Sequence, residues 1–322
     1  MGFGAKYIGI DLGGTKIAGI LADAGGNIFC QDKIPTKKEE GKERVLARIY
    51  SLIRQLMKEA EPGEVKGIGL CSPGPLNVKT GVIIETPNLK WENTPVVALM
   101  EREFTLPVIL ENDGNAAAFG EYRYGAARGT SDMIYMTVST GIGGGIIANG
   151  KLVYGRDYSA GEVGHVVILP GGPVCSCGRR GCIESLASGT SIVREVKNRL
   201  AKGEKSLLQE FGGENLNRLT AKEVEAAAVQ GDCLALSVLE KAFYYLGIAV
   251  GNLVNILNPE VVVIGGGVSK MGPLLFEPVQ KAIGLSAFPH MCRDLPVVPA
   301  QLGGEAGTKG MVALLHRKVQ KG

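Results

Sequence analysis

Residues 7–22 read YIGIDLGGTKIAGILA, and this stretch decides the fold class. A short apolar run ends at Asp11, a glycine-rich string follows, and the chain becomes apolar again at residues 17–22. Two apolar runs around such a string predict two antiparallel strands joined by a tight turn. Gly25 and Gly26 predict a second turn, which leads into a third strand at residues 28–33.

Helices and strands alternate after this hairpin. Apolar residues at helical spacing predict a helix over residues 45–57, and residues 65–70 and 108–110 have the pattern of buried strands. The order of strands, helix, strand and helix is typical of an α/β unit. A strand, a glycine-rich string and a hairpin occur again at residues 133–153. The sequence therefore predicts a weak internal repeat.

The second half also contains local signals for the ends of helices. The string TAKE at residues 220–223 is a capping box that opens a helix. Asp232 is placed to cap a long helix that stops at Asn258, before a proline. Residues 261–264 then predict a buried strand that leads into Gly265, Gly266 and Gly267, and a final helix ends near residue 316.

Composition excludes several classes of protein. The 322 residues include 35 Lys and Arg against 32 Asp and Glu, a net charge of +3, which argues against a dedicated nucleic-acid binder. A hydrophobic share of 45% excludes a disordered chain, and the length predicts about two domains. The first apolar stretch is too short for a signal peptide or a membrane span, so we expect a cytoplasmic protein. The cysteine count of seven is odd, which argues against a disulfide framework.

Three glycine-rich strings each follow a predicted strand, at residues 13–15, 140–145 and 265–267. Exposed backbone N–H groups in such loops can bind phosphate oxygens, although any one string alone can be a simple turn. Together they predict a nucleotide site that is neither a P-loop nor a Rossmann motif. Asp11, beside the first string, suits Mg²⁺, directly or through water. Its alternative role is that of a turn residue bonded to its own backbone.

Two further groups of residues can carry chemistry. Glu111, Asn112 and Asp113 end a predicted strand and could orient a polar substrate and accept a proton. The alternative is an Asx turn or helix N-cap. Cysteines at residues 175, 177 and 182, with His165 upstream, match a closed structural zinc site of three thiolates and one imidazole. The alternative there is a set of reduced thiols in a glycine-rich loop.

Taken together, these motifs resemble the ROK family of sugar kinases, closest to its bacterial glucokinases, over nearly the whole chain. The motifs are DLGGTK at 11–16, SPGP at 72–75, ENDGN at 111–115, TGIGGG at 140–145, GEVGH at 161–165, CSCGRRGCIE at 175–184 and GGG at 265–267. The resemblance implies an actin-like ATPase (ribonuclease H-like) α/β fold, with two α/β domains and a central cleft. A small domain would comprise residues 1–121 and 305–322, and a large one residues 122–304.

The resemblance also implies roles for individual residues. Asp113 would be the general base for the 6-hydroxyl of the sugar. The sugar would be bound by Gly74, Asn88, Asn112, Asp113, Glu162, His165 and Glu184. The phosphates would be bound by Asp11, Gly13, Gly14, Thr15, Lys16, Thr140 and Gly141, and Gly265, Gly266 and Gly267 would lie near the adenosine. Zinc would be bound by His165, Cys175, Cys177 and Cys182, with the second ring nitrogen of His165 facing the sugar.

The activity implied is ATP-dependent phosphorylation of a hexose, D-glucose above all, with ATP, Mg²⁺ and structural Zn²⁺. Kinases for N-acetylmannosamine, N-acetylglucosamine or fructose are alternatives, and polyphosphate or ADP as the phosphoryl donor stays open. An alternative of another class is a sugar-responsive transcriptional regulator of the same family. It is disfavoured because the first strand begins by Tyr7, without room for a helix-turn-helix before it. We expect a homodimer that binds neither nucleic acid nor a membrane.

Overall fold

The computed structural model of the chain describes residues 4–86, 89–212 and 216–320. The chain forms two compact units, each built from separate segments of the sequence. Unit 1 comprises Met1–Ser131, Gly145–Gly161 and Gln301–Gly322, and unit 2 comprises Asp132–Gly144 and Glu162–Ala300. The domain limits expected at residues 121 and 304 stay a prediction, because a compact unit and a family domain need not share their limits.

Unit 1 contains a mixed sheet with the strand order β3-β2-β1-β4-β8. Its strands are β1 (Lys6–Leu12), β2 (Lys16–Asp23), β3 (Ile28–Pro35), β4 (Val65–Ser72) and β8 (Val108–Asn112). β1, β2 and β3 pair antiparallel, as the glycine turns predict, whereas β1, β4 and β8 pair parallel. A smaller sheet contains β5 (Leu76–Asn77), β6 (Val82–Thr86) and β7 (Trp91–Thr94).

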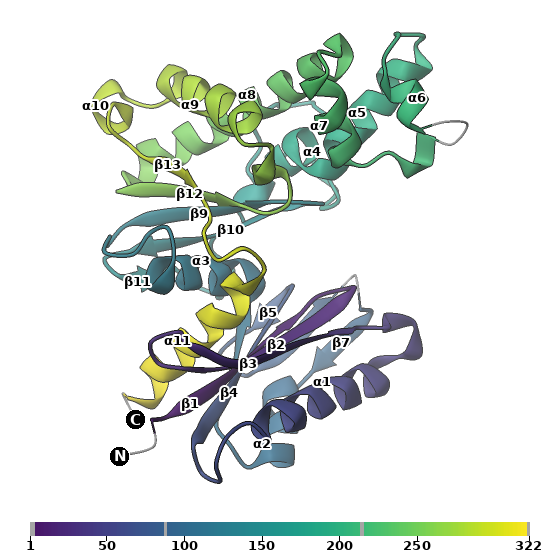
Figure 1. Cartoon of the computed structure of the whole chain (residues 1–322). Coiled ribbons are helices and arrows are strands. Elements are labelled where there is room, and N and C mark those ends of the chain that lie inside the picture. Colours follow the sequence, from purple (N-terminus) through teal and green to yellow (C-terminus); the bar gives the residue numbers. More distant parts are fainter. Residues whose placement is uncertain (1–3, 87–88, 213–215, 321–322) are drawn as a thin grey trace. The chain divides into compact units, whose positions relative to one another are not determined.

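Helices cover both faces of the unit 1 sheet, and Figure 1 shows α1 and α11 on opposite faces. The helices of this unit are α1 (Lys42–Met57), α2 (Val96–Phe104), α3 (Asp113–Tyr124) and α11 (Ala306–Val319). The buried stripe of α1, which includes Ile49 and Leu52, packs with Ile10 of β1, whereas Leu315 of α11 packs with Tyr7 from the other side. Alternate residues of β1 thus contact different helices, as the pleat of a strand requires.

The second sheet has the strand order β11-β10-β9-β12-β13. Its strands are β9 (Met133–Val138), β10 (Ile142–Ala148), β11 (Lys151–Leu152), β12 (Val261–Gly265) and β13 (Val297–Pro299). β10 runs on from unit 2 into the segment of residues 145–161, which also carries β11. The position of each strand in this order matches that of the corresponding strand in the unit 1 sheet, so the internal repeat predicted from residues 7–22 and 133–153 is confirmed at the level of topology.

The helices of unit 2 include the predicted capped helices. They are α4 (Ile183–Ala187), α5 (Gly189–Ala201), α6 (Leu208–Gly212), α7 (Ala221–Val229), α8 (Cys233–Leu257), α9 (Pro273–Ser286) and α10 (Pro289–Cys292). Thr220 forms the capping box of α7, and Asp232 caps α8 through the backbone N–H of Ala235. Within the described ranges, α8 alone is long and apolar enough to cross a membrane. Since 56% of its most apolar window is buried inside the protein, it has the character of a core helix.

One prediction about the glycine-rich strings is wrong. Residues 142–145 were expected to continue the loop that begins at Thr140, but they form the first half of β10. The glycine at position 145 serves close packing, because a Cβ there would lie 2.6 Å from the Cβ of Ala118 in α3. Only residues 139–141 form the turn between β9 and β10.

Candidate active site

The carboxyl ends of three parallel strands bring the predicted polar residues of unit 1 to one edge of its sheet. Asp11 of β1 is in register with Cys71 of β4, which is in register with Glu111 of β8. One residue further, Ser72 is in register with Asn112. Ligand sites in open α/β sheets form at such an edge, where loops and helix N-termini meet. Residues 11, 72–75 and 111–113 are therefore parts of one local site.

Asn112 fixes the start of α3, whose first residue is Asp113. The Asn112 side-chain oxygen accepts hydrogen bonds from the backbone N–H groups of Gly114 (2.9 Å) and Asn115 (3.2 Å). The N-cap alternative considered for Asn112 is therefore correct, and it leaves the side-chain N–H groups to meet a ligand. The Asp113 carboxylate is exposed and accepts from the N–H of Gly114 at 2.9 Å. The cap thus sets the position of an exposed carboxylate.

Asp11 lies in an unusual electrostatic environment. Burial, followed by the negative charge of Asp113, raises the pKa of Asp11 to about 6 despite the opposing charge of Lys16. The Cys71 thiol is fully buried and donates a hydrogen bond to this carboxylate. Since a cation favours the charged form of such a carboxylate, the pair of Asp11 and Asp113 suits a site for Mg²⁺.

We expect the Asp11→Asn variant to be more stable than the wild-type protein at pH 7 without Mg²⁺, by on the order of 2 kcal/mol. The pKa of Asp11 is about 6 in the folded state, against the ordinary value of 3.8 that we take for the unfolded chain. The folded state therefore binds more protons than the unfolded chain between these two pH values. Stability contributed by the protonated carboxyl is present below about pH 4 and is lost as pH rises to about 6. Urea unfolding in EDTA at several pH values measures the difference, with the exposed Asp157→Asn variant as the control. A variant no more stable than the wild type at pH 7 would contradict the prediction.

The first glycine-rich string forms a closed turn. The N–H of Gly13 donates to the backbone oxygen of Lys16 at 3.0 Å, and the N–H of Thr36 donates to that of Thr15 at 2.9 Å. The Gly13 N–H is therefore bonded within the turn, as expected if this string is a simple turn. The side chains of Thr15 and Lys16 are exposed, so a hydroxyl and an ammonium group remain for a phosphate.

In unit 2, the ends of β9 and β12 lie beside a large cavity. Gly265 of β12 is in register with Thr137 of β9, and the next residue, Gly266, has a φ of +89°. A Cβ at Gly266 would lie 2.2 Å from the backbone oxygen of Val138, so the close approach of the two strands requires glycine there. The cavity has a volume of about 730 Å³, and Ser139, Thr140 and Gly267 are among the residues that line it. This volume is sufficient for a nucleoside.

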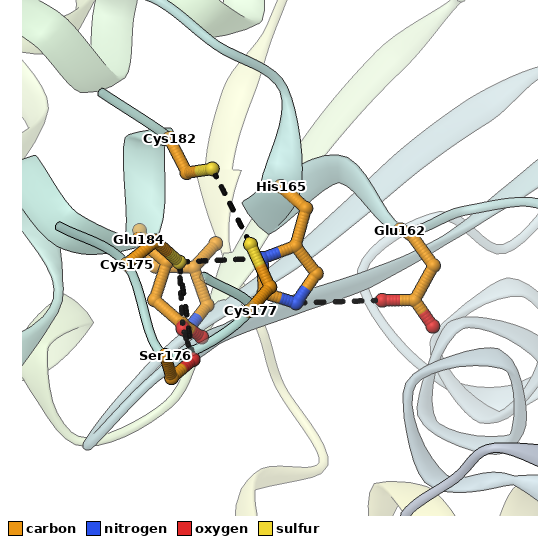
Figure 2. A network of polar contacts seen from close by, with 8 residues as sticks. Glu162, His165, Cys175, Ser176, Cys177, Cys182 and Glu184 are labelled. Atoms are coloured by element: carbon orange, nitrogen blue, oxygen red, sulfur yellow. Dashed lines mark hydrogen bonds and ion pairs between the residues drawn. The ribbon is translucent and has the colours of Figure 1, made fainter. Parts of the chain in front are cut away.

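The predicted zinc ligands gather at one point of unit 2, although they come from two loops (Figure 2). The ligand atoms of His165, Cys175, Cys177 and Cys182 all lie within 4.8 Å of one another. The sulfurs of Cys177 and Cys182 are 3.7 Å apart, and that of Cys175 is 3.5 Å from Nδ1 of His165. Tetrahedral zinc with bonds of about 2.3 Å to sulfur separates two sulfurs by about 3.8 Å. The four residues therefore fit zinc.

The protonation of the thiols also suits a cation. A hydrogen bond from the backbone N–H of Arg179 lowers the pKa of Cys177 to about 6, which favours the thiolate that zinc binds. Burial raises the pKa of Cys175 to about 11, so this thiol needs a bound cation to lose its proton at neutral pH. The second ring nitrogen of His165, Nε2, lies 4.0 Å from a carboxylate oxygen of Glu162 and so faces away from the cysteines.

Glu184 connects the cysteine loop to the turn after β9. One oxygen of its carboxylate accepts from the backbone N–H of Ile142 at 3.0 Å, and the other accepts from the Ser176 hydroxyl at 2.7 Å. A Cβ at Gly141 would lie 2.6 Å from the Glu184 carboxylate, so glycine at this position lets the two approach. Glu184 therefore holds together two segments that were assigned to the sugar and to the phosphates.

A comparison with protein families matches residues 7–318 to the ROK family model. The chain belongs to the ROK family. It is 38% identical to a glucokinase from Halalkalibacterium halodurans over 98% of this chain and 97% of that protein. It is 34% identical to a xylose repressor from Caldicellulosiruptor bescii, over 96% of this chain and 78% of the repressor. A crystal structure of a ROK glucokinase from Streptomyces griseus in complex with glucose and AMPPNP is similar, with 34% identity, a TM-score of 0.82 and coverage of 96% and 99% of the two chains.

Membership of the ROK family confirms the predicted actin-like ATPase fold. Within unit 1, the structure brings Asp11, Asn112 and Asp113 together, and a Cβ at Gly74 would lie 3.8 Å from the side-chain nitrogen of Asn112. Within unit 2, Glu162 lies beside His165, and Glu184 lies beside Cys175 and Ser176. Asn88 lies outside the described residues. The individual roles of these residues stay predictions.

Sequence reasoning missed other residues of the ROK fold that line the cavity in unit 2. They come from α5, from the start of α7 and from the segment after β12, and include Gly189, Thr190, Lys197, Asn198, Lys222 and Val268. The string SGT at residues 188–190 and the capping box at residues 220–223 each mark a helix N-terminus, where backbone N–H groups attract anions. These were the available signals, but only the fold places both helix starts at one cavity.

Proposed function

We propose that the chain is an ATP-dependent hexose kinase that phosphorylates the 6-hydroxyl of D-glucose. The observation that carries the proposal is the exposed Asp113 carboxylate, set at a strand end by the cap of α3. The nearly full-length similarity to glucokinases and the cavity beside Thr140 and Gly267 support it. Asp113 would align the sugar hydroxyl and accept its proton, whereas the cavity in unit 2 would bind the nucleoside of ATP.

Phosphoryl transfer passes through a loose transition state, so positioning and neutralisation of charge matter most. Mg²⁺, held by Asp11 directly or through water, supplies neutralisation of the phosphate charge when bound. Thr15, Lys16 and Thr140 would bind the phosphates with the backbone of Gly14 and Gly141, whereas the Gly13 N–H is already bonded to the backbone oxygen of Lys16. Asn112 would orient the sugar through its side-chain N–H groups, because its oxygen is used by the helix cap.

Zinc would have a structural role in this kinase. The cysteine cluster would fix Nδ1 of His165, so that Nε2 is presented to the sugar together with Glu162 and Glu184. A metal that sets the position of such a loop contributes to sugar binding without taking part in phosphoryl transfer.

The acceptor preference is a separate prediction. We expect kcat/KM to be highest for glucose, lower for mannose and glucosamine, and lowest for N-acetylated sugars. The groups proposed for the far end of the sugar, Glu162, His165 and Glu184, are polar and suited to hydroxyls, and sites built to bond hydroxyls discriminate strongly. A coupled ADP-release assay over a panel of sugars, including fructose, measures this order. A higher kcat/KM for N-acetylmannosamine or N-acetylglucosamine would overturn the glucose assignment and leave the kinase assignment intact.

A regulator is the second candidate, because repressors of the family share 30–34% identity with this chain. Sequence-specific binding of chromosomal fragments in a gel-shift assay, without ADP release in the presence of any hexose, would favour this candidate. We further propose that the protein is cytoplasmic and forms a homodimer. Sedimentation of the purified protein tests the dimer. Measuring the formation of hexose 6-phosphate with polyphosphate or ADP in place of ATP tests the identity of the donor, because neither of these donors releases ADP.

A further inference from the structure

A second cavity, of about 490 Å³, lies wholly within unit 1 beside β8, the edge strand of its sheet. Ile109 and Glu111 of β8 line it, together with Leu314 of α11 and residues of α3 and of the β10–β11 hairpin. Arg317 of α11 donates to the backbone oxygen of Gly150 at 3.4 Å, which joins two of the walls. Figure 1 labels α3, α11 and β11, three of the elements whose residues line it. The volume is typical of sites for small organic ligands.

The charges around this cavity are unbalanced. Lys79, Lys151, Arg317 and Lys318 line it, and Glu111 is the one acidic residue among the lining residues. In the described part of the chain, no ion pair involves any of the four cations. The Glu111 carboxylate already accepts a hydrogen bond from the Tyr154 hydroxyl at 2.9 Å. The opening of the cavity therefore attracts anions.

The interior of the cavity is mostly apolar. Val78, Val97, Ile109 and Leu314 line it and are only partly buried, although each packs against the core of unit 1. A free sugar there would leave hydroxyls without partners, at a cost in free energy. An apolar body gains free energy by covering these side chains. The lining therefore selects a ligand with an apolar body and an anionic head.

Glu111 connects the cavity to the proposed base. Its Oε1 accepts from the backbone N–H of Asn112 at 2.9 Å and from the side chain of Asn115 at 3.1 Å, while its Oε2 bonds Tyr154. Asn112 in turn caps the helix that begins with Asp113. A negative charge placed beside Tyr154 changes the strengths of these hydrogen bonds. Binding in the cavity can therefore affect Asp113 through the carboxylate of Glu111.

We propose that this cavity is a regulatory site for a small amphipathic organic anion, with an apolar body and a carboxylate, sulfonate or phosphate head. The apolar lining binds the body, Lys151 and Arg317 bind the head, and Glu111 transmits occupancy to the end of β8. The regulatory half rests on the proposed kinase activity, whereas the binding half is independent of it.

Binding is tested on the whole chain with two fluorescent probes that share one apolar body. 8-Anilinonaphthalene-1-sulfonate carries an anionic head, and N-phenyl-1-naphthylamine lacks it. We expect one equivalent of the sulfonate to bind, and the double variant Lys151→Glu with Arg317→Glu to raise its Kd at least about fivefold, because two attractive charges become repulsive. The Kd of the uncharged probe should change less than about twofold, since it has no charge to attract.

The control is the double variant Lys33→Glu with Arg44→Glu, which changes the net charge equally at exposed positions of unit 1 away from the cavity. Thermal unfolding of both double variants shows that the fold is kept. Equal sulfonate binding by the two double variants, or equal binding of both probes by the wild-type protein, would overturn the site.

The regulatory half is tested in the coupled kinase assay with glucose. We expect the sulfonate to change kcat/KM in the wild type, with half of the effect at the Kd from fluorescence, and to have no such effect in the cavity double variant. Specific binding without any change in kcat/KM overturns the regulatory half. A wild-type protein without kinase activity would overturn the proposed function instead, and the binding result would stand.

Discussion

The Asp113→Asn variant is expected to lose about 10²–10⁴-fold in kcat while keeping most of its affinity for glucose, the usual share of a general base in catalysis. The amide keeps the shape of the side chain and can still accept the hydrogen bond from the Gly114 N–H. It cannot take the proton of the sugar 6-hydroxyl. Steady-state kinetics with glucose and ATP measure kcat, and equilibrium titration with glucose measures binding.

The matched control is Asp294→Asn, which makes the same chemical change at an exposed position of unit 2. It should leave kcat within about twofold of the wild type, as is usual for a surface substitution remote from a site. Asp113 also begins α3, where a negative charge stabilises the helix by about 0.3–1 kcal/mol. Unfolding of both variants separates this small loss of stability from the loss of turnover. A kcat near the wild-type value for Asp113→Asn would refute the role of the base.

The Cys177→Ser variant is expected to lose its zinc and to become less stable by several kcal/mol, because structural zinc contributes its binding free energy to folding. Its KM for glucose should rise as well, since the cluster holds the loop of His165 against the loop that leads to Glu184. Elemental analysis should find one zinc per wild-type chain. Urea unfolding and kinetics give the other two quantities.

Cys233→Ser provides the control for the metal site. Cys233 is exposed at the first residue of α8, outside the cluster, and its replacement should leave zinc content, stability and KM unchanged. Treatment of the wild-type protein with a chelator should reproduce the loss seen in Cys177→Ser, and added zinc should reverse it. A protein without zinc and with unchanged stability and activity would refute the metal site.

Much of the fold follows from local patterns in the chain. The apolar stripe that includes Ile49 and Leu52 predicts α1, and Thr220 and Asp232 mark the starts of two helices at the correct residues. The period of buried residues and the caps depend on neighbours within a few positions, so they are legible without a structure. The spacing of the cysteines was equally informative, because the three lie within one short loop that brings their sulfurs together.

Contacts between distant segments could not be predicted in this way. That Asp11, Cys71 and Glu111 are in register depends on how β1, β4 and β8 pair, and the bonds of Glu184 to Ile142 and Ser176 depend on how three segments pack. The glycines of β10 looked like a phosphate loop, whereas Gly145 serves the packing of α3. A local pattern states which residues share a face, but strand register and side-chain packing are set by the free energy of the whole fold.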